Sequence, residues 1–217
     1  MLKMIVFAGP LTAASANAIA LSQTPVAGPL IINGASATAG VATLDNPRRV
    51  LITTAADESS RTFTITGTTF TNTAISETVA GPNIGTIASN IDFKTVTSVN
   101  ISGDAAGAVT VGTNGVAGSS WVRFDNWALP QISIQVDVYG TANFTVQQTL
   151  DDPNFVGAEL ITPADVVWVN HPDTNLVGSS TGAQGNYGYM PIFARIVLNS
   201  GTGDVEAAFV QSGSVAR

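Results

Sequence analysis

The 217-residue sequence contains no cysteine and a single histidine. The absence of cysteine excludes disulfides, thiolate catalysis and cysteine-based zinc sites. The single histidine, His171, has no second histidine to share a metal with. Pro172 and Asp173 follow His171, a pattern typical of a loop. We therefore expect a non-enzymatic protein with no catalytic residues, no cofactor and no metal site.

Charge is also scarce. Charged residues make up 11% of the chain, against about 25% in ordinary soluble domains, and the net charge is −7. The nearest approach to a basic cluster is the pair Arg48 and Arg49, so we expect no nucleic-acid binding, which depends on neutralising phosphates. No apolar run reaches the roughly 18 residues of a membrane span, so we expect no membrane association. A surface rich in Thr, Ser and Asn suits protein assemblies, although a Thr-rich β-protein has the same composition.

Acidic residues gather in two expected loops, at residues 57–58 and 151–152. Carboxylates in a turn can bind calcium, but neither loop has the D-x-D-x-D-G spacing of a calcium loop. A glycosidase would need two opposed carboxylates in a cleft, which nothing in the sequence supports. We interpret both loops as solvated turns and leave calcium binding open.

Alternation of apolar and polar residues with a period of two dominates the chain. It is clearest at residues 61–67, 131–139 and 143–148, where Thr, Ser or Gln alternate with Phe, Ile or Val. Such alternation of β-branched residues indicates half-buried antiparallel strands. Only residues 11–21, which are rich in alanine, could form a short helix, and they offer little apolar face to bury.

Gly, Asn and Asp turn signals separate these strands at short intervals, for example at residues 45–47, 114–115 and 139–140. Short strands between such turns indicate a sandwich or barrel. A glycine-rich stretch at 112–120 is interpreted as a linker, and residues 99–109 and 197–205 as similar closing hairpins. We predict an all-β fold of two antiparallel, Ig-like or jelly-roll-like β-sandwiches, 26–116 and 117–217.

The first 25 residues combine Lys3, a short apolar run and then small residues, which loosely resembles a secretory signal. Pro10 interrupts the run, so we interpret residues 1–25 as an extended arm that orders by packing on a neighbour. Several residues are of types that anchor protein interfaces. The predicted interface residues are Phe7, Leu11, Trp121, Arg123 and Trp127. Trp121 and Trp127 could equally be core, and a core role is favoured for Trp168.

Several segments resemble a group of virion proteins of tailed bacteriophages. They are residues 41–51, 61–67, 76–83, 92–99, 120–125 and 182–195. The resemblance extends over most of residues 20–217 and consists of strand and turn sequence, so it implies a structural virion component and carries over no catalytic residues.

Among virion roles, a capsid decoration (cement) protein fits best. The resemblance implies a small, acidic or neutral β-protein on the capsid exterior, with the major capsid protein and copies of itself as partners, as a dimer or trimer. Many weak contacts repeated by symmetry would provide the affinity. A tail or head–tail junction component is one alternative, and a carbohydrate-binding module for host recognition is another.

Overall fold

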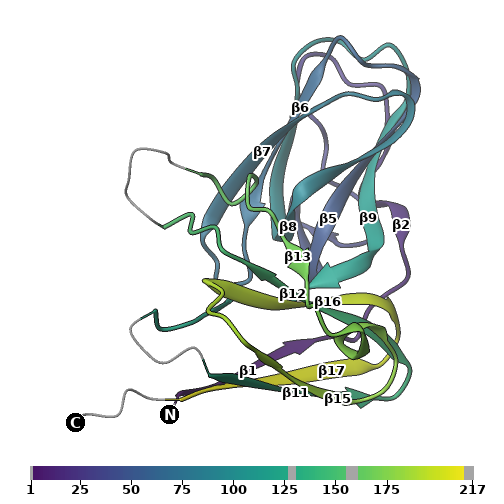
Figure 1. The fold of residues 1–217 in the computed structure, drawn as a ribbon. Coiled ribbons are helices and arrows are strands. Elements are labelled where there is room, and N and C mark those ends of the chain that lie inside the picture. The colour runs from purple at the N-terminus through teal and green to yellow at the C-terminus, as the bar shows by residue number, and fades with distance from the viewer. Residues whose placement is uncertain (1, 127–130, 155–160, 213–217) are drawn as a thin grey trace. The chain divides into compact units, whose positions relative to one another are not determined.

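The computed structural model describes residues 2–126, 131–154 and 161–212, and the side chain of Leu2 is not among the described parts. These residues form 17 β-strands and one short 3-10 turn, with no α-helix in the described ranges. The all-β prediction is confirmed. The chain divides into two compact units: unit 1 comprises Met1–Leu11 and Gly118–Arg217, and unit 2 comprises Thr12–Ala117. Figure 1 shows the strands of both.

Unit 2 is built on one antiparallel sheet in the order β9-β5-β8-β6-β7. Three further strands extend this sheet, with β2 pairing β9, β3 pairing β8 and β4 pairing β5. The strands are β2 (Ser15–Gln23), β3 (Gly28–Pro29), β4 (Ala37–Thr38), β5 (Val41–Asp57), β6 (Thr62–Thr68), β7 (Ala74–Ala80), β8 (Asn83–Ile101) and β9 (Val109–Gly118).

Strand β6 shows why this sequence forms a sheet. Phe63 and Ile65 are completely buried, while the threonines between them face outward. Successive side chains of a strand point to opposite faces, so the alternation creates one apolar face and one hydroxyl-bearing face. The apolar face buries neighbours from β5, β8 and β9, among them Ile52, Phe93 and Val111.

Strands β5 and β8 are long and pair with register shifts, and one of these shifts lies where a turn was expected, at residues 45–47 of β5. Residues 45–47 lie inside β5, where the register with β8 shifts between Thr43 and Arg48. Pro47 has no N–H for the ladder, so the pairing is interrupted while the strand continues. Bulges bend a sheet and increase its twist. The predicted turn at 45–47 is therefore wrong, and the bulge lets the sheet curve round its core.

The prediction of a glycine-rich linker at residues 112–120 is also wrong, because residues 112–118 belong to β9. A Cβ at Gly112 would lie 2.0 Å from the carbonyl oxygen of Ser15, on β2. Glycine is required here because the backbone of β2 lies directly against β9. The possible helix at residues 11–21 is a strand for the same reason: the small side chains of β2 permit this close approach.

Unit 1 contains two antiparallel sheets. One has the order β1-β17-β11-β15; in the other, β12 pairs β16, with β13 and β14 on β12 and β10 on β16. The elements are β1 (Leu2–Ala8), β10 (Val122–Arg123), β11 (Ile132–Tyr139), β12 (Ala142–Thr149), β13 (Val169–Asn170), the 3-10 turn η1 (Thr174–Leu176), β14 (Val177–Ser179), β15 (Ala183–Tyr187), β16 (Phe193–Gly201) and β17 (Asp204–Gln211).

The core of unit 1 lies between these two sheets. Ile134 and Phe209 from one sheet are buried, as are Phe144 and Ile196 from the other. Aromatic rings meet edge-on in this core, with Phe124 5.9 Å from Phe209 between ring centroids, a favourable aromatic geometry. The alternation that predicted β11 and β12 is therefore the inward face of a β-sandwich.

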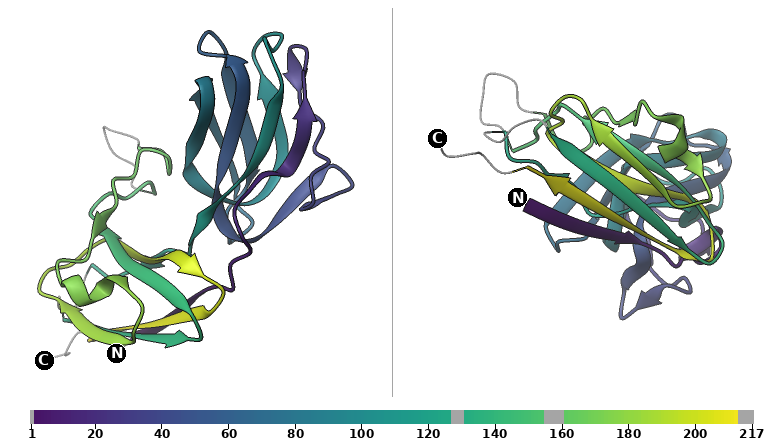
Figure 2. Two further views of the ribbon diagram at one scale, coloured as in Figure 1. Left: turned by 90° about the vertical axis from the view of Figure 1, so that its right-hand side faces the viewer. Right: turned by 60° about the horizontal axis from the view of Figure 1, so that its bottom comes forward.

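The first 25 residues do not form an arm. Residues Leu2 to Ala8 pair antiparallel with Gln211 to Val205 of β17 throughout β1, and residues 15–23 form β2. The backbone groups of β1 that face β17 are therefore paired within the chain. Residues 1–11 thus belong with the C-terminal half, and the units divide after residues 11 and 117 instead of after 25 and 116. Figure 2 shows β1 beside β17.

The two expected closing hairpins are not hairpins. Strands β8 and β9 both pair with β5, one on each side of it, so residues 99–109 lead across that strand. Strand β16 pairs with β12, whereas β17 pairs with β1 and β11, so the turn near Gly201 leads from one sheet of unit 1 to the other. The weak internal repeat predicted from these two segments is not a repeat of structure.

Candidate functional site

His171 lies inside unit 1 with 4% of its surface exposed. Its Nδ1 accepts a hydrogen bond from the backbone N–H of Asp173 at 3.0 Å, so Nε2 carries the proton of the neutral ring. Burial lowers the pKa of His171, although contacts with Asn186 and Asp173 oppose this. The ring packs 4.8 Å from that of Tyr187. A general base must reach its substrate, and this imidazole is enclosed by core side chains.

The acidic loop at residues 57–58 supports the fold of unit 2. The carboxylate of Glu58 is completely buried and accepts hydrogen bonds from the backbone N–H groups of Ala106 and Gly107, at 2.6 and 3.1 Å. Arg61 lies 3.3 Å from its other oxygen. Asp57 accepts from the N–H of Ser59, and hydrogen bonds from Ser59 lower the pKa of Asp57. These carboxylates bind the chain's own donors.

The second acidic loop is similarly occupied. Asp151 accepts a hydrogen bond from the backbone N–H of Val167 at 2.7 Å. Both carboxylate oxygens of Asp152 bind Arg123, at 3.0 and 2.6 Å. Burial would raise the pKa of Asp152, but the hydrogen bonds and charge of Arg123 hold it below its ordinary value. In the parts of the chain that the structure describes, no group of three or more His, Asp or Glu side chains could hold a metal ion.

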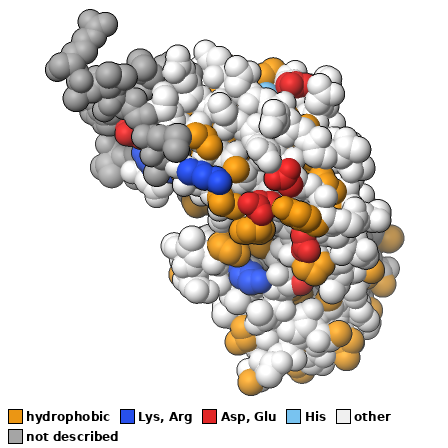
Figure 3. All heavy atoms as spheres, turned by 90° about the horizontal axis from the view of Figure 1, so that it is seen from below, with side chains coloured by type: hydrophobic (Ala, Val, Ile, Leu, Met, Phe, Trp, Pro, Cys, Tyr) orange, Lys and Arg blue, Asp and Glu red, His pale blue; other side chains and the backbone are white. Residues whose placement is uncertain are grey.

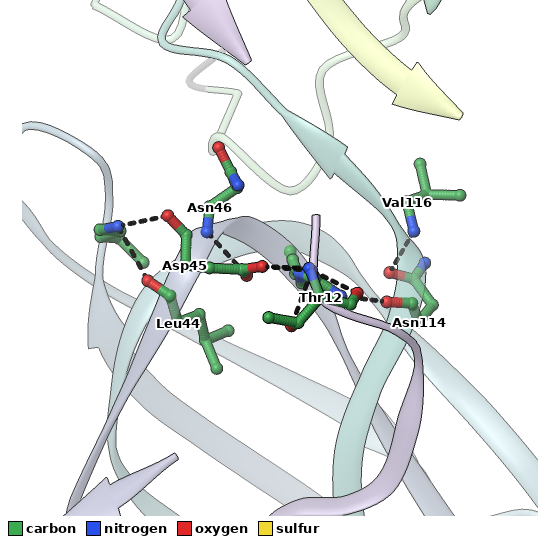
Figure 4. Close-up of polar contacts among 8 residues, drawn as sticks. Thr12, Leu44, Asp45, Asn46, Asn114 and Val116 are labelled. Carbon is green, nitrogen blue, oxygen red and sulfur yellow. Dashed lines mark hydrogen bonds and ion pairs between the residues drawn. The ribbon is translucent and has the colours of Figure 1, made fainter. Parts of the chain in front are cut away.

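The basic pair of the sequence stabilises unit 2. Figure 4 shows three residues that bind Arg48, namely Thr12, Asp45 and Asn114. The side chain of Arg48 is completely buried. Its guanidinium donates to Asp45 at 2.5 Å, to the carbonyl of Thr12 at 2.8 Å and to the carbonyl of Asn114 at 2.9 Å. Burial would raise the pKa of Asp45, but hydrogen bonds from Thr12 and Arg48 keep it below its ordinary value. Arg48 thus joins β5, β9 and the start of the unit.

The neighbouring Arg49 binds Asp92 at 2.8 Å and also donates to the carbonyl of Ser89. Lys94 donates to the carbonyl oxygens of Leu44 and Asp45. These three cations are therefore used within unit 2, and they do not form a patch that could follow a phosphate backbone.

The predicted interface residues are placed very differently. Phe7 is 62% exposed on β1, whereas Leu11 is 6% exposed and its side chain is not available to a partner. Arg123 is exposed, binds Asp152 and places its guanidinium 5.3 Å from the ring centre of Phe193. Trp127 lies outside the described residues.

Trp121 is half-buried in an aromatic cluster of unit 1. Its ring lies 5.0 Å from that of Trp168 and 5.7 Å from that of Phe193, both edge-on. The guanidinium of Arg195 covers the Trp168 ring at 4.2 Å. Sugar-binding sites present exposed aromatic faces, whereas these rings stack against one another and against an arginine. The cluster packs within unit 1, and Trp168, for which a core role was favoured, is half-buried in it.

A surface that the sequence showed only in part is the outer side of β6, β7 and the second half of β8. The hydroxyls of Thr64 and Thr78 lie 2.9 Å apart, and those of Thr68 and Thr95 lie 2.7 Å apart. We call this surface the hydroxyl face. It comprises Thr64, Thr66, Thr68, Ser76, Thr78, Thr95, Ser98 and Asn100. None of these side chains carries a charge. The alternation predicted outward threonines, but their partners depend on strand order, which the sequence did not reveal.

Comparisons with protein-family models, with curated proteins and with solved structures found no match. The resemblance to phage virion proteins therefore stays a prediction. Among the described residues there is no helix with the length and apolar character needed to cross a bilayer.

Proposed function

We propose that this chain is a non-enzymatic structural protein of a tailed-phage virion, a decoration protein that lies on the capsid exterior and binds the major capsid protein and further copies of itself. The resemblance described above supplies the virion context. The hydroxyl face of unit 2 is the observation that carries the proposal.

The hydroxyl face is suited to being covered by another protein. Its side chains stand on three neighbouring strands and pair across them, as Thr66 and Ser76 do at 3.4 Å, so little rotamer entropy remains to be lost on binding. Burying a charged group is costly, whereas a hydroxyl exchanges water for a protein partner at little net cost. Each copy needs to bury only a small area, because many identical contacts repeated over the capsid shell together provide the affinity.

The arrangement of charges supports the same conclusion. The arginines at positions 48 and 49, Lys94, and the carboxylates of Glu58 and Glu77 are engaged in contacts inside unit 2. The few charges of this unit therefore stabilise its fold, and the outer side of β6 and β7 stays neutral. A neutral surface can meet several chemically different neighbours without like-charge repulsion.

The location is tested by immuno-electron microscopy of purified particles, with antibody against this chain. Label distributed over the shell supports the decoration role. Label confined to the tail or to one vertex contradicts it and favours the tail or junction alternative. Absence of label from intact particles contradicts a virion role altogether.

The surface is tested with Thr78→Lys, which puts a charge in the middle of the hydroxyl face at an exposed position. We expect about tenfold weaker co-sedimentation with particles stripped of the wild-type chain, which corresponds to about 1.4 kcal/mol. The matched control is Thr181→Lys, an equally exposed threonine in unit 1, and it should bind as the wild type does. Equal binding of both variants would show that the hydroxyl face is not the contact surface.

A further inference from the structure

The two outermost strands β1 and β7 differ in how they are protected against pairing with other chains. An unprotected sheet edge presents unpaired backbone N–H and C=O groups, and natural proteins guard such edges with prolines, bulges or inward-pointing charges. Strand β7 carries such a charge: the buried carboxylate of Glu77 faces inward and accepts from the backbone N–H groups of Asn90 and Ile91. It is therefore built to remain an edge.

Strand β1 is less protected, since its only charged side chain is Lys3, near one end of the strand. All seven of its residues pair with β17 without a register shift, and no described strand pairs with its other edge. Within Leu2–Ala8 there is no proline, no glycine and no acidic residue. Its outer face presents Ile5 and Phe7, which are 44% and 62% exposed, beside Lys3. The right-hand view of Figure 2 shows this strand at the margin of its sheet.

The outer face of the sheet beside β1 is acidic. Phe7 lies opposite Glu206 of β17, and Glu206 lies opposite Asp137 of β11. Lys3 lies four residues from Phe7, so the positive end of β1 and the acidic row are separated along the strand. Figure 3 shows apolar and acidic side chains side by side on the side of the molecule where this sheet is exposed.

We infer that β1 pairs antiparallel with β1 of a second copy of this chain, about a two-fold axis at Ile5, and so joins two four-stranded sheets into one. This register pairs the whole strand, residue 2 with 8, 3 with 7 and 4 with 6. It cannot extend further, because Pro10 provides no N–H. Any other register leaves part of the exposed edge unpaired.

The side chains complement one another in this register. Ile5 meets Ile5 of the second copy, and half-buried Met4 meets Val6 of the second copy on the core side. On the outer face, Lys3 of each copy lies opposite Phe7 of the other copy. Within that other copy, Phe7 lies beside Glu206 of β17, so Lys3 is one strand away from this carboxylate. The ammonium group can therefore lie over an aromatic ring next to a carboxylate, a cation–π contact with charge complementarity. A two-fold axis provides this contact twice.

This inference deepens the proposed function by naming the surface between copies, but its test uses the isolated full chain. Sedimentation velocity should show a concentration-dependent dimer. Ile5→Lys, which places two lysines face to face at the axis, should weaken dimerisation at least about tenfold, because like charges directly opposite destabilise a strand pair. The control is Leu21→Lys, which alters a side chain of equal exposure, 44%, on β2 and should dimerise normally.

Charge exchange tests the register. Lys3→Glu and Glu206→Lys should each weaken the dimer. The double variant should recover part of the loss, because the attraction between positions 3 and 206 is restored with its signs reversed while the cation–π contact with Phe7 is not. Tryptophan fluorescence reports on unit 1. At protein concentrations low enough for the wild type to be monomeric, it should show unchanged unfolding midpoints for all variants and so separate loss of pairing from loss of fold.

Because the chain has no cysteine, a single cysteine also reports the pairing. Ile5→Cys should form a disulfide-linked dimer under mild oxidation, whereas Leu21→Cys should not, since directly opposed Cβ atoms lie within reach of a disulfide. A monomer at all concentrations, or stronger cross-linking from Lys3→Cys than from Ile5→Cys, would overturn the inference. If Ile5→Lys is monomeric and still labels the shell at full occupancy, copies do not need this contact on the particle, and the proposed function stands without it.

Discussion

The two units of this protein differ in what their buried charged side chains bind: buried Arg195 of unit 1 binds the Gln147 amide and covers the Trp168 ring. In unit 2, Arg48 and Glu58 are completely buried and each binds backbone groups from distant parts of the unit. In unit 1, the ion pair of Arg123 with Asp152 lies at the surface, and aromatic rings such as Phe124, Tyr187 and Phe209 fill the core.

This difference predicts which substitutions destabilise each unit most. A buried charge that loses its partner is left uncompensated, which destabilises a protein far more than the loss of a surface pair. All three tryptophans and all three tyrosines lie beyond residue 117. Tryptophan fluorescence therefore reports only on unit 1, while far-UV circular dichroism reports on both units. The predictions below compare these two signals.

The largest effect is expected from Arg48→Met. The change removes the donor that binds Asp45, Thr12 and Asn114, and should lower the free energy of unfolding of unit 2 by about 3–5 kcal/mol. In urea, the far-UV transition should move to lower concentration while the fluorescence transition keeps its midpoint. Arg49→Met, which changes a partly exposed arginine with a single carboxylate partner, should have a smaller effect. An equal effect of the two changes would contradict the role assigned to Arg48.

The next effect is expected from Glu58→Gln. The amide keeps the shape of the side chain but removes the charge that accepts from Ala106 and Gly107, and hydrogen bonds to charged groups contribute about 1.5–3 kcal/mol. The far-UV midpoint in urea should fall accordingly. Asp57→Asn changes the adjacent exposed carboxylate and serves as control. A far-UV midpoint unaltered by Glu58→Gln would show that the hydrogen bonds of the Glu58 carboxylate do not stabilise unit 2.

His171 makes unit 1 sensitive to pH. Because burial lowers its pKa from the ordinary 6.5, the unfolded chain binds a proton more readily than the folded unit does. The contribution of neutral His171 is complete above about pH 6.5 and is lost as the pH falls toward its folded pKa. The fluorescence-detected melting temperature should therefore fall as the pH is lowered from 7.5 to 5. His171→Gln should flatten this dependence, and an unchanged slope would contradict the assignment.

The smallest effect is expected from Arg123→Ala. The arginine side chain is 48% exposed, so solvent screens its pair with Asp152 and the contribution should be at most about 1 kcal/mol. The fluorescence midpoint should barely move. A loss as large as that of Arg48→Met would remove the contrast between the two units.

The strands were predictable where one face is buried. In β6, β11 and β12 the alternation of apolar and polar residues directly reflects the two faces of a sheet. Alternation does not reveal which strands become neighbours, because that depends on contacts far apart in sequence. Residues 99–109 and 197–205 therefore resembled hairpins, although their flanking strands pair elsewhere.

Glycine and proline were misread for a related reason. Gly112 looks like part of a linker, but its missing side chain lets the backbone of β2 approach. Pro47 looks like a turn, but it lies at a bulge of β5. Of the predicted interface residues, Phe7 was identifiable as a large apolar side chain near the start. The burial of Leu11 was not, since it depends on where β1 is anchored.

The pairing of β1 with β17 also matters while the chain is being made. Strand β1 leaves the ribosome about 200 residues before its partner β17 does. At about 5–20 residues per second, roughly 200 residues correspond to a wait of about 10–40 s. Unit 2 is continuous in sequence and can fold during this time. Until β17 has emerged, the apolar side chains of β1 lack their partner strand. A nascent chain stalled before β17 is therefore the species most exposed to misassembly with its neighbours on the same messenger RNA.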